Sequence, residues 1–378
     1  MHSKLVTFFF NLIFFVYTPI TVLVSMEVIG ELPFGWIFLS CSLSLPFLIF
    51  INNDVKGIAL GKPILFFYLF LFLFSVTLVN NYTSSNSELV KGHVSNIIVL
   101  LTLYILALKI DFSNTLFKKV GVAAFLVSTL FILYNRNFIM NFWDFLLVSL
   151  NYQGIGMCYF ILSLPIFMLE NRILKNICFV LSMVCLNIIG ARTEMISLLF
   201  IIVIFEIFSR PRQIRVILLI VLTLLFLIFL LIGKDILNFI GLEKVTVLFN
   251  LEKDESWIER KEFLNEGLNT IKNNIIFGKY GNYEEGKYIH NILSAWVDLG
   301  LFGFLVLFLS LTFILFEALK IIYVEHAQKK DVLFLGFALT IFIVAVFSKQ
   351  YTYPLIGFCV GMYNHFSNKR YNILLNKN

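Results

Sequence analysis

Charged residues are scarce in this chain. They make up 14% of the 378 residues, whereas 60% of the residues are hydrophobic. A soluble protein usually carries about 25% charged residues, so this deficit excludes an ordinary soluble protein and indicates an integral membrane protein. The apolar stretch 5–25 is too long for a cleavable signal peptide and lacks a small-x-small end. We therefore expect it to be retained as a first membrane span.

Patterns typical of metal sites and disulfides are also missing. All five cysteines fall in apolar segments, and none has metal-ligand spacing or a position suited to an extracytoplasmic disulfide. No Asp-x-Asp motif or other carboxylate cluster occurs, so we expect no metal ion and no other cofactor. No internal repeat or low-complexity linker divides the chain, and we expect a single membrane domain over residues 1–378.

Long apolar runs dominate the sequence. Because a span needs about 20 apolar residues, and fewer inside a bundle, the runs predict an all-α polytopic membrane protein with about twelve transmembrane helices. We expect these helices near 5–25, 35–51, 63–80, 93–109, 120–134, 154–169, 174–189, 194–208, 214–233, 295–319, 332–348 and 352–366. The longest polar segment, 234–290, then forms a large loop between the ninth and tenth spans.

The distribution of basic residues predicts the orientation. Short cytoplasmic loops collect Lys and Arg. With the N-terminus inside, 17 basic residues fall on the cytoplasmic side, and the short outer loops hold only Lys91, Arg136, Arg192 and Lys349. This asymmetry predicts that both termini are cytoplasmic and that the loop 234–290 faces outward.

The large loop carries a helical pattern of its own. Ser256 and Glu259 have the spacing of a capping box at a helix start. Leu264, Leu268, Ile271 and Ile275 follow at helical spacing, and Arg260 precedes Leu264 by four residues on the same face. We therefore expect a loop helix whose Arg260 turns toward the membrane or a cavity. The glycine turns of the following segment, which contains Tyr280, return the chain to His290.

Candidate catalytic residues gather at the predicted outer boundary. His290 and Asn291 stand directly before an apolar run, and an interfacial histidine that only anchors a helix is the alternative reading of this pair. Arg192 lies between two spans, where it either snorkels to the interface or binds an anion. Two arginines and one histidine suit a lipid diphosphate, because the guanidinium groups would neutralise the phosphates and neutral His290 could accept a proton from a sugar hydroxyl.

Two acidic residues near these candidates receive less weight. Glu194 follows Arg192 by two residues and could simply pair with it. Asp298 lies at the start of the next span, where it could cap the helix or pair locally. We expect Asn291 to orient neighbouring groups or to start the helix.

These motifs resemble the O-antigen polymerase and O-antigen ligase superfamily (Wzy and WaaL type) over about residues 180–320. His290-Asn291 and Gly300-Leu-Phe-Gly303 match the family's His-Asn and Gly-x-x-Gly signature, and their eight-residue spacer is the shorter form, which favours a polymerase. Arg192 matches the arginine at a span's outer end, although alanine precedes it here instead of serine. Arg260, followed by a helix and an Ile-Phe-Gly turn, matches the loop arginine.

The resemblance implies a GT-C-like membrane glycosyltransferase of the bacterial inner membrane, with its active site facing the periplasm. Its donor would be an undecaprenyl-diphosphate-linked oligosaccharide, with His290 as the base, Arg192 and Arg260 at the diphosphate, and Asn291, Glu194, Asp298 and Tyr280 in support. Membrane lipid and a chain-length regulator protein are the implied partners, and no nucleic acid is expected. No metal or nucleotide sugar would be needed.

Two other functions stay open at this point. An O-antigen ligase would use the same donor site and move the finished glycan to lipid A core. A flippase for the lipid-linked oligosaccharide belongs to a different class, and flippases tend to bury charges near the midplane and to show paired halves. The charges of this chain gather instead at the outer rim, which argues against a flippase and does not separate the polymerase from the ligase.

Overall fold

The computed structural model describes residues 2–32, 35–51, 61–82, 87–141, 151–211, 213–218, 221, 255–283, 287–323 and 327–375. All regular elements in these ranges are helical. They are α1 His2–Phe14, α2 Tyr17–Ser25, α3 Gly35–Ile51, α4 Lys62–Asn81, α5 Ser87–Lys109, α6 Thr115–Tyr134, α7 Arg136–Asn141, α8 Tyr152–Ser163, η2 Leu164–Met168, α9 Arg172–Ile189, α10 Arg192–Phe208, α13 Glu255–Asn273, α14 Ser294–Leu319, η5 Lys320–Tyr323, α15 Lys329–Phe347 and α16 Leu355–Leu375.

Seven helices among the described residues are long and apolar enough to cross a membrane. They are His2–Ser25, Lys62–Asn81, Glu88–Lys109, Thr115–Tyr134, Arg172–Ile189, Ser294–Tyr323 and Lys329–Phe347, and Gly35–Ile51 and Tyr152–Met168 are shorter apolar helices. The expected all-helical membrane protein is therefore confirmed, whereas the number twelve stays a prediction. Most of the expected span 214–233 and the loop residues 234–254 lie outside the described residues.

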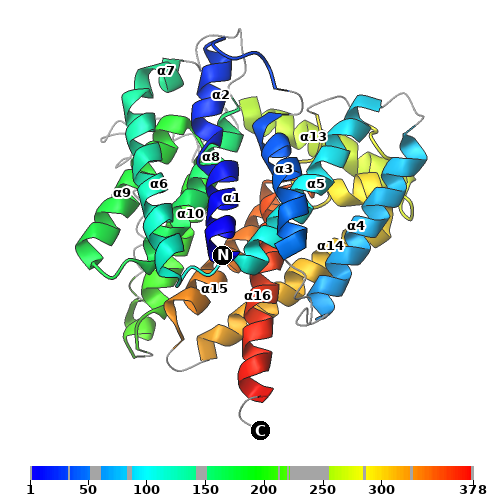
Figure 1. Cartoon of the computed structure of the whole chain (residues 1–378). Coiled ribbons are helices and arrows are strands. Elements are labelled where there is room, and N and C mark those ends of the chain that lie inside the picture. The colour runs from blue at the N-terminus through cyan, green and yellow to red at the C-terminus, as the bar shows by residue number, and fades with distance from the viewer. Residues whose placement is uncertain are drawn as a thin grey trace.

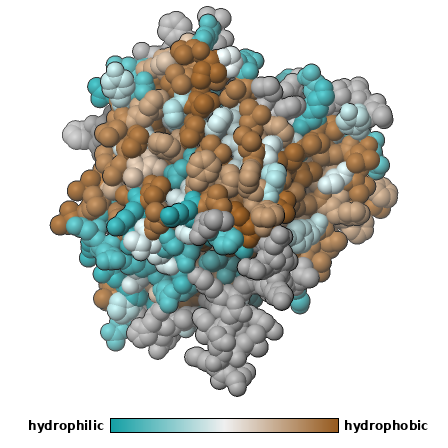
Figure 2. Space-filling model, in the orientation of Figure 1, coloured by the Kyte–Doolittle hydropathy of each residue, from teal (hydrophilic) through white to brown (hydrophobic). Residues whose placement is uncertain are grey.

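The helices form a bundle whose neighbours are distant in sequence (Figure 1). α5 packs against α3 and α16, α4 packs along α14, and α10 packs along α15. α1 and α6 lie side by side and connect this part to α8 and α9. Figure 2 shows apolar side chains over much of one face of the molecule, with hydrophilic ones gathered toward its lower left, as a membrane-embedded bundle requires.

The first expected span is two helices. α1 ends at Phe14 and α2 begins at Tyr17, and the amides of Phe15 and Val16 both donate to the carbonyl of Asn11. The break joins two apolar segments, so it leaves no mark on the hydropathy pattern that predicted one helix.

The expected loop helix is present as α13, which already includes Ser256, so a helix start with Ser256 as its cap was wrong. The turn directly after α13 docks on α14. The amide of Leu301 donates to the carbonyls of Ile275 and Ile276 at 3.1 and 3.2 Å, and the indole of Trp296 donates to Ile275 at 2.8 Å. These contacts join the loop to the membrane bundle.

Two glycines make this docking possible. Gly300 has φ +71°, which interrupts α14, and a Cβ there would lie 2.1 Å from the carbonyl oxygen of Ile276. A Cβ on Gly278 would lie 2.5 Å from the carbonyl oxygen of Val297. Glycine is required at both positions, because backbone meets backbone and both residues have positive φ.

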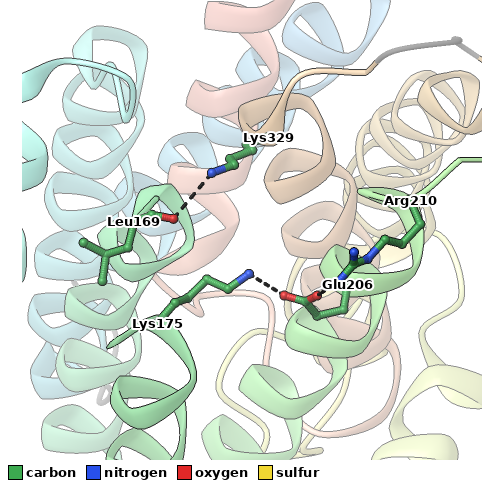
Figure 3. A network of polar contacts seen from close by, with 5 residues as sticks. All are labelled: Leu169, Lys175, Glu206, Arg210 and Lys329. Atoms are coloured by element: carbon green, nitrogen blue, oxygen red, sulfur yellow. Dashed lines mark hydrogen bonds and ion pairs between the residues drawn. The ribbon is translucent and has the colours of Figure 1, made fainter. Parts of the chain in front are cut away.

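Basic residues at the C-terminal end of α10 are held by protein acceptors (Figure 3). Lys175 of α9 forms an ion pair with Glu206, and Arg210 reaches the same carboxylate at 3.4 Å. Lys329 donates to the carbonyl of Leu169 at 3.4 Å. Arg215 donates to the carbonyls of Arg210 and Ile322 at 2.7 and 2.9 Å. This group of residues is called the paired basic end below.

Candidate functional site

A cavity of about 370 Å³ opens at the other end of α10. Its lining includes Arg192, Arg260 and His290, which the sequence analysis selected, together with Glu194. These residues come from the start of α10, from α13 and from the segment before α14, so the fold brings together groups that are up to 98 residues apart in sequence. Further polar and aromatic lining residues include Asn96, Asn151, Gln153, Thr193, Tyr288, Ser348, Lys349, Gln350 and Tyr353.

Three helices begin at this cavity. The lining contains residues 151–154 at the start of α8, 190–194 at the start of α10 and 352–354 directly before α16. A helix N-terminus carries roughly half a positive charge, and its first amides have no partner within the helix. Asn151 caps α8 by accepting from the amide of Gly154 at 2.8 Å, whereas α10 has no side-chain cap. The cavity therefore has a positive potential that favours an anion.

A tight turn places Arg192 at the cavity. Gly190 ends α9 with φ +77°, and α10 starts two residues later at Arg192. The turn packs closely on α8, because a Cβ on Gly156 would lie 2.3 Å from the Cβ of Ala191. Arg192 itself is exposed, so its side chain stands at the cavity's rim.

His290 is seated by the loop helix. The preceding Ile289 is buried against α13, where a Cβ on Gly267 would lie 2.1 Å from its Cδ1 atom. The ring of Tyr288 lies 4.6 Å from the His290 ring, centroid to centroid, and the ring of Phe263 lies 6.3 Å away. His290 lines the cavity, and in the described part of the chain neither of its ring nitrogens has a hydrogen-bond partner.

Burial and nearby cations keep His290 neutral. Its pKa is lowered from 6.5 to about 4, first by burial and then by the positive charges of Arg260 and Lys349. At neutral pH the imidazole is therefore unprotonated and can accept a proton. Arg260 also acts on Tyr288, whose pKa is nevertheless raised because burial outweighs the cation.

Arg260 is half-buried and lines the cavity from α13. Among the described residues no carboxylate pairs with it. A buried cation is costly without a counter-ion, and the guanidinium group is suited to two oxygens of one phosphate. Arg260 faces a cavity, as the helical spacing predicted.

Lys349 is a cavity residue that the sequence analysis did not select. Its ammonium lies 3.1 Å from Oε1 of Glu194 and 5.4 Å from the ring centroid of Tyr353. Glu194 is buried and Lys349 is mostly covered, with 3% and 13% of their side chains exposed. Lys349 was one of only four basic residues in the predicted outer loops, and that scarcity was the signal that could have found it.

Asp298 lies outside the described cavity lining and holds the loop in place. Its carboxylate accepts from the amide of Gly281 at 3.0 Å, from the hydroxyl of Tyr283 at 2.8 Å and from the hydroxyl of Tyr351 at 2.9 Å. With 1% of its surface exposed, Asp298 ties the loop to the segment between α15 and α16. Its support for the site is therefore positional.

Tyr280 and Asn291 are likewise not among the described residues that line the cavity. The Tyr280 hydroxyl lies 2.8 Å from Nδ1 of His93 on α5. The side chain of Asn291 accepts from the amide of Leu293 at 2.9 Å, and its carbonyl accepts from the hydroxyl of Ser294 at 2.6 Å. Asn291 thus shapes the turn that leads into α14.

Comparisons with protein-family models, with curated proteins and with solved structures gave no match to this chain. No group of three or more His, Cys, Asp or Glu side chains lies close enough to hold a metal ion in the described ranges. The cavity itself offers two arginines, an ion-paired lysine, a neutral histidine and several side-chain amides.

Proposed function

We propose that this chain is an O-antigen or related surface-polysaccharide polymerase. It would transfer the growing glycan from undecaprenyl diphosphate onto a new lipid-linked repeat unit, with no metal ion. The observation that carries the proposal is the shared cavity of Arg192, Arg260 and His290. A cationic site beside a neutral base fits a reaction in which a diphosphate leaves and a hydroxyl attacks.

The diphosphate would bind among the cations. Arg260 and Arg192 would contact its phosphate oxygens, and the first amides of α10 would add to the positive potential. As the glycosidic bond breaks, negative charge grows on the leaving diphosphate, and prearranged cations lower the energy of that transition state. This is the role that a metal ion has in many phosphate-dependent enzymes.

His290 would activate the acceptor. The hydroxyl oxygen of the new repeat unit attacks the anomeric carbon of the donor sugar and forms the new C–O bond. The C–O bond to the diphosphate breaks, and its electron pair stays on the diphosphate. The proton of the hydroxyl passes to a ring nitrogen of neutral His290, as general-base catalysis requires.

Donor binding would strengthen this base. The pKa of free His290 is about 4, partly because Arg260 and Lys349 are positive. A diphosphate beside these cations offsets their charge and raises the pKa of His290. The imidazole is then a stronger base when the donor is present than when the cavity is empty.

The finer architecture belongs to the same proposal. The chain would cross a bacterial inner membrane twelve times in a GT-C-like arrangement, with both termini cytoplasmic and the cavity facing the periplasm. The asymmetry of 17 basic residues against four supports this orientation. Reporter fusions at both termini and in the loop 234–254 test it, and a periplasmic signal at either terminus would contradict it.

Deletion of the gene in its source bacterium tests the function. Loss of a polymerase leaves lipopolysaccharide with a single repeat unit, and plasmid-borne wild type restores the ladder whereas the His290→Ala variant does not. Bare core after deletion would identify a ligase, and an unchanged ladder would reject both functions.

A further inference from the structure

An apolar groove of about 220 Å³ runs between α10 and α15. The side chains of Ser197, Thr340 and Val344 are buried at its floor. Exposed Ile196, Ile343 and Phe347 form part of its rim. The groove is lined almost wholly by carbon, and α15 is one of the candidate membrane spans.

The groove and the cationic cavity adjoin each other. Thr193 and Ser348 line both, one at the start of α10 and the other directly after α15. Cations and helix N-termini therefore lie next to one end of an apolar groove. Such a pairing of charge and apolar surface fits a molecule with an anionic head and a hydrocarbon tail.

The two helices pack closely at one point, where a Cβ on Gly336 would lie 3.1 Å from the side chain of Ile201. The lining of the groove runs from the residues next to this contact, Phe200 on α10 and Thr340 on α15, to Thr193 and Ser348 at the cavity. At 1.5 Å per residue, the stretch from Thr193 to Phe200 is about 10 Å long. That length holds the first part of a long chain, and the remainder would lie in the bilayer.

We infer that the groove between α10 and α15 binds the first part of the isoprenoid chain whose diphosphate occupies the cavity. This inference rests on the proposed function for the identity of the head group. It adds that the tail leaves the cavity past Thr193 and Ser348, and that apolar contacts along Ile196, Ile343 and Phe347 distinguish a lipid diphosphate from a free one.

Binding to the purified full-length chain in lipid nanodiscs tests the inference with two probes, undecaprenyl diphosphate and inorganic pyrophosphate. Ile343→Trp fills the groove at its exposed rim. It should weaken undecaprenyl diphosphate binding roughly tenfold and leave pyrophosphate binding unchanged. Leu199→Trp is the matched control, because Leu199 on α10 is also exposed but does not line the groove. It should change neither affinity.

The Arg260→Ala variant tests the diphosphate site separately from the groove, because it should lower the affinity for both undecaprenyl diphosphate and pyrophosphate. If Arg260→Ala weakens both and Ile343→Trp weakens neither, the head site stands and the groove is wrong. If Arg260→Ala weakens neither, the diphosphate site itself is wrong. Added phosphatidylglycerol serves as a competitor for undecaprenyl diphosphate binding. If it competes as strongly as undecaprenyl diphosphate itself, and if Ile343→Trp abolishes that competition, the groove is a general lipid site. That result would overturn the inference.

Discussion

The two ends of α10 use basic residues in different ways. At the paired basic end, Lys175 and Arg210 share Glu206, and Arg215 donates to two carbonyls. At the cavity end, Arg260 has no carboxylate partner among the described residues, and Arg192 stands at the rim. Lys349 forms an ion pair there with Glu194.

We infer that this difference separates cations that hold the fold together from cations that bind an anion. A cation whose acceptors are all in the protein fixes helices relative to each other, and its loss affects stability. A half-buried cation with no counter-ion costs free energy, and that cost is recovered when an anion binds. The cavity end therefore has the features of a binding site, and substitutions at the two ends should have different consequences.

Loss of the base should have the largest effect. His290→Ala should lower the rate of glycan transfer by about 10²–10⁴-fold, because general-base catalysis contributes that much. The rate is measured as conversion of lipid-linked repeat units by purified protein. His365→Ala is the matched control, since His365 hydrogen-bonds to the carbonyl of Leu108 far from the cavity. An equal loss in both variants would mean that the effect is on folding.

Arginine substitutions compare the two ends directly. Arg260→Ala should lower the rate about 10²–10³-fold, as expected when one group that stabilises developing charge is removed. Arg210→Ala removes the same group at the paired basic end and should leave the rate within about twofold. Transfer assays at equal amounts of folded protein decide this. Equal rates in the two variants would remove the distinction between the ends.

Removal of the hydrogen bonds that join the loop to the helix bundle should lower the stability of the protein. Asp298→Ala leaves two tyrosine hydroxyls and one amide without their acceptor, at a cost of about 2–4 kcal/mol. Thermal unfolding in detergent should show a clearly lower Tm. Asn291→Ala, which removes one local acceptor, should lower the Tm less, and the opposite order would contradict the role of Asp298.

The pH profile tests the electrostatics of the cavity. In the proposed mechanism neutral His290 is the base, and its pKa is about 4, so kcat/KM should stay level from neutral pH down to about 5 and fall below that. An ordinary histidine would lose activity from about pH 6.5. Arg260→Ala removes one cause of the low pKa, so its residual activity should fall at a higher pH. Recovery of activity on return to neutral pH is the control for unfolding.

The smallest effect is expected at the paired basic end. Glu206→Gln removes a partly exposed ion pair and should cost about 1 kcal/mol, seen as a slightly lower Tm without a change in transfer rate. If Glu206→Gln lowered the transfer rate more than Arg260→Ala does, the paired basic end and not the cavity end would be the one that matters for transfer.

Part of the site could be predicted from the expected alternation of spans. Arg192 stands at the start of one expected span and His290 at the end of the large loop, and the two expected spans between them predict that both lie on one face of the membrane. Arg260 followed from helical spacing in the loop. These inferences need the order of the elements but not their packing.

The rest depends on packing. Lys349 reaches the cavity only because α15 lies along α10, and no sequence pattern pairs those helices. Asp298 binds Tyr283 and Tyr351, 15 residues before it and 53 residues after it. The break between α1 and α2 joins two apolar segments, so hydropathy does not show it.

The most direct test is transfer by the purified chain in nanodiscs with undecaprenyl-diphosphate-linked repeat units. We expect a ladder of longer lipid-linked glycans from the wild type and from Arg210→Ala, and single repeat units only from His290→Ala and Arg260→Ala. A ladder of the same length and yield from all four proteins would contradict the assignment of the cavity as the site of transfer.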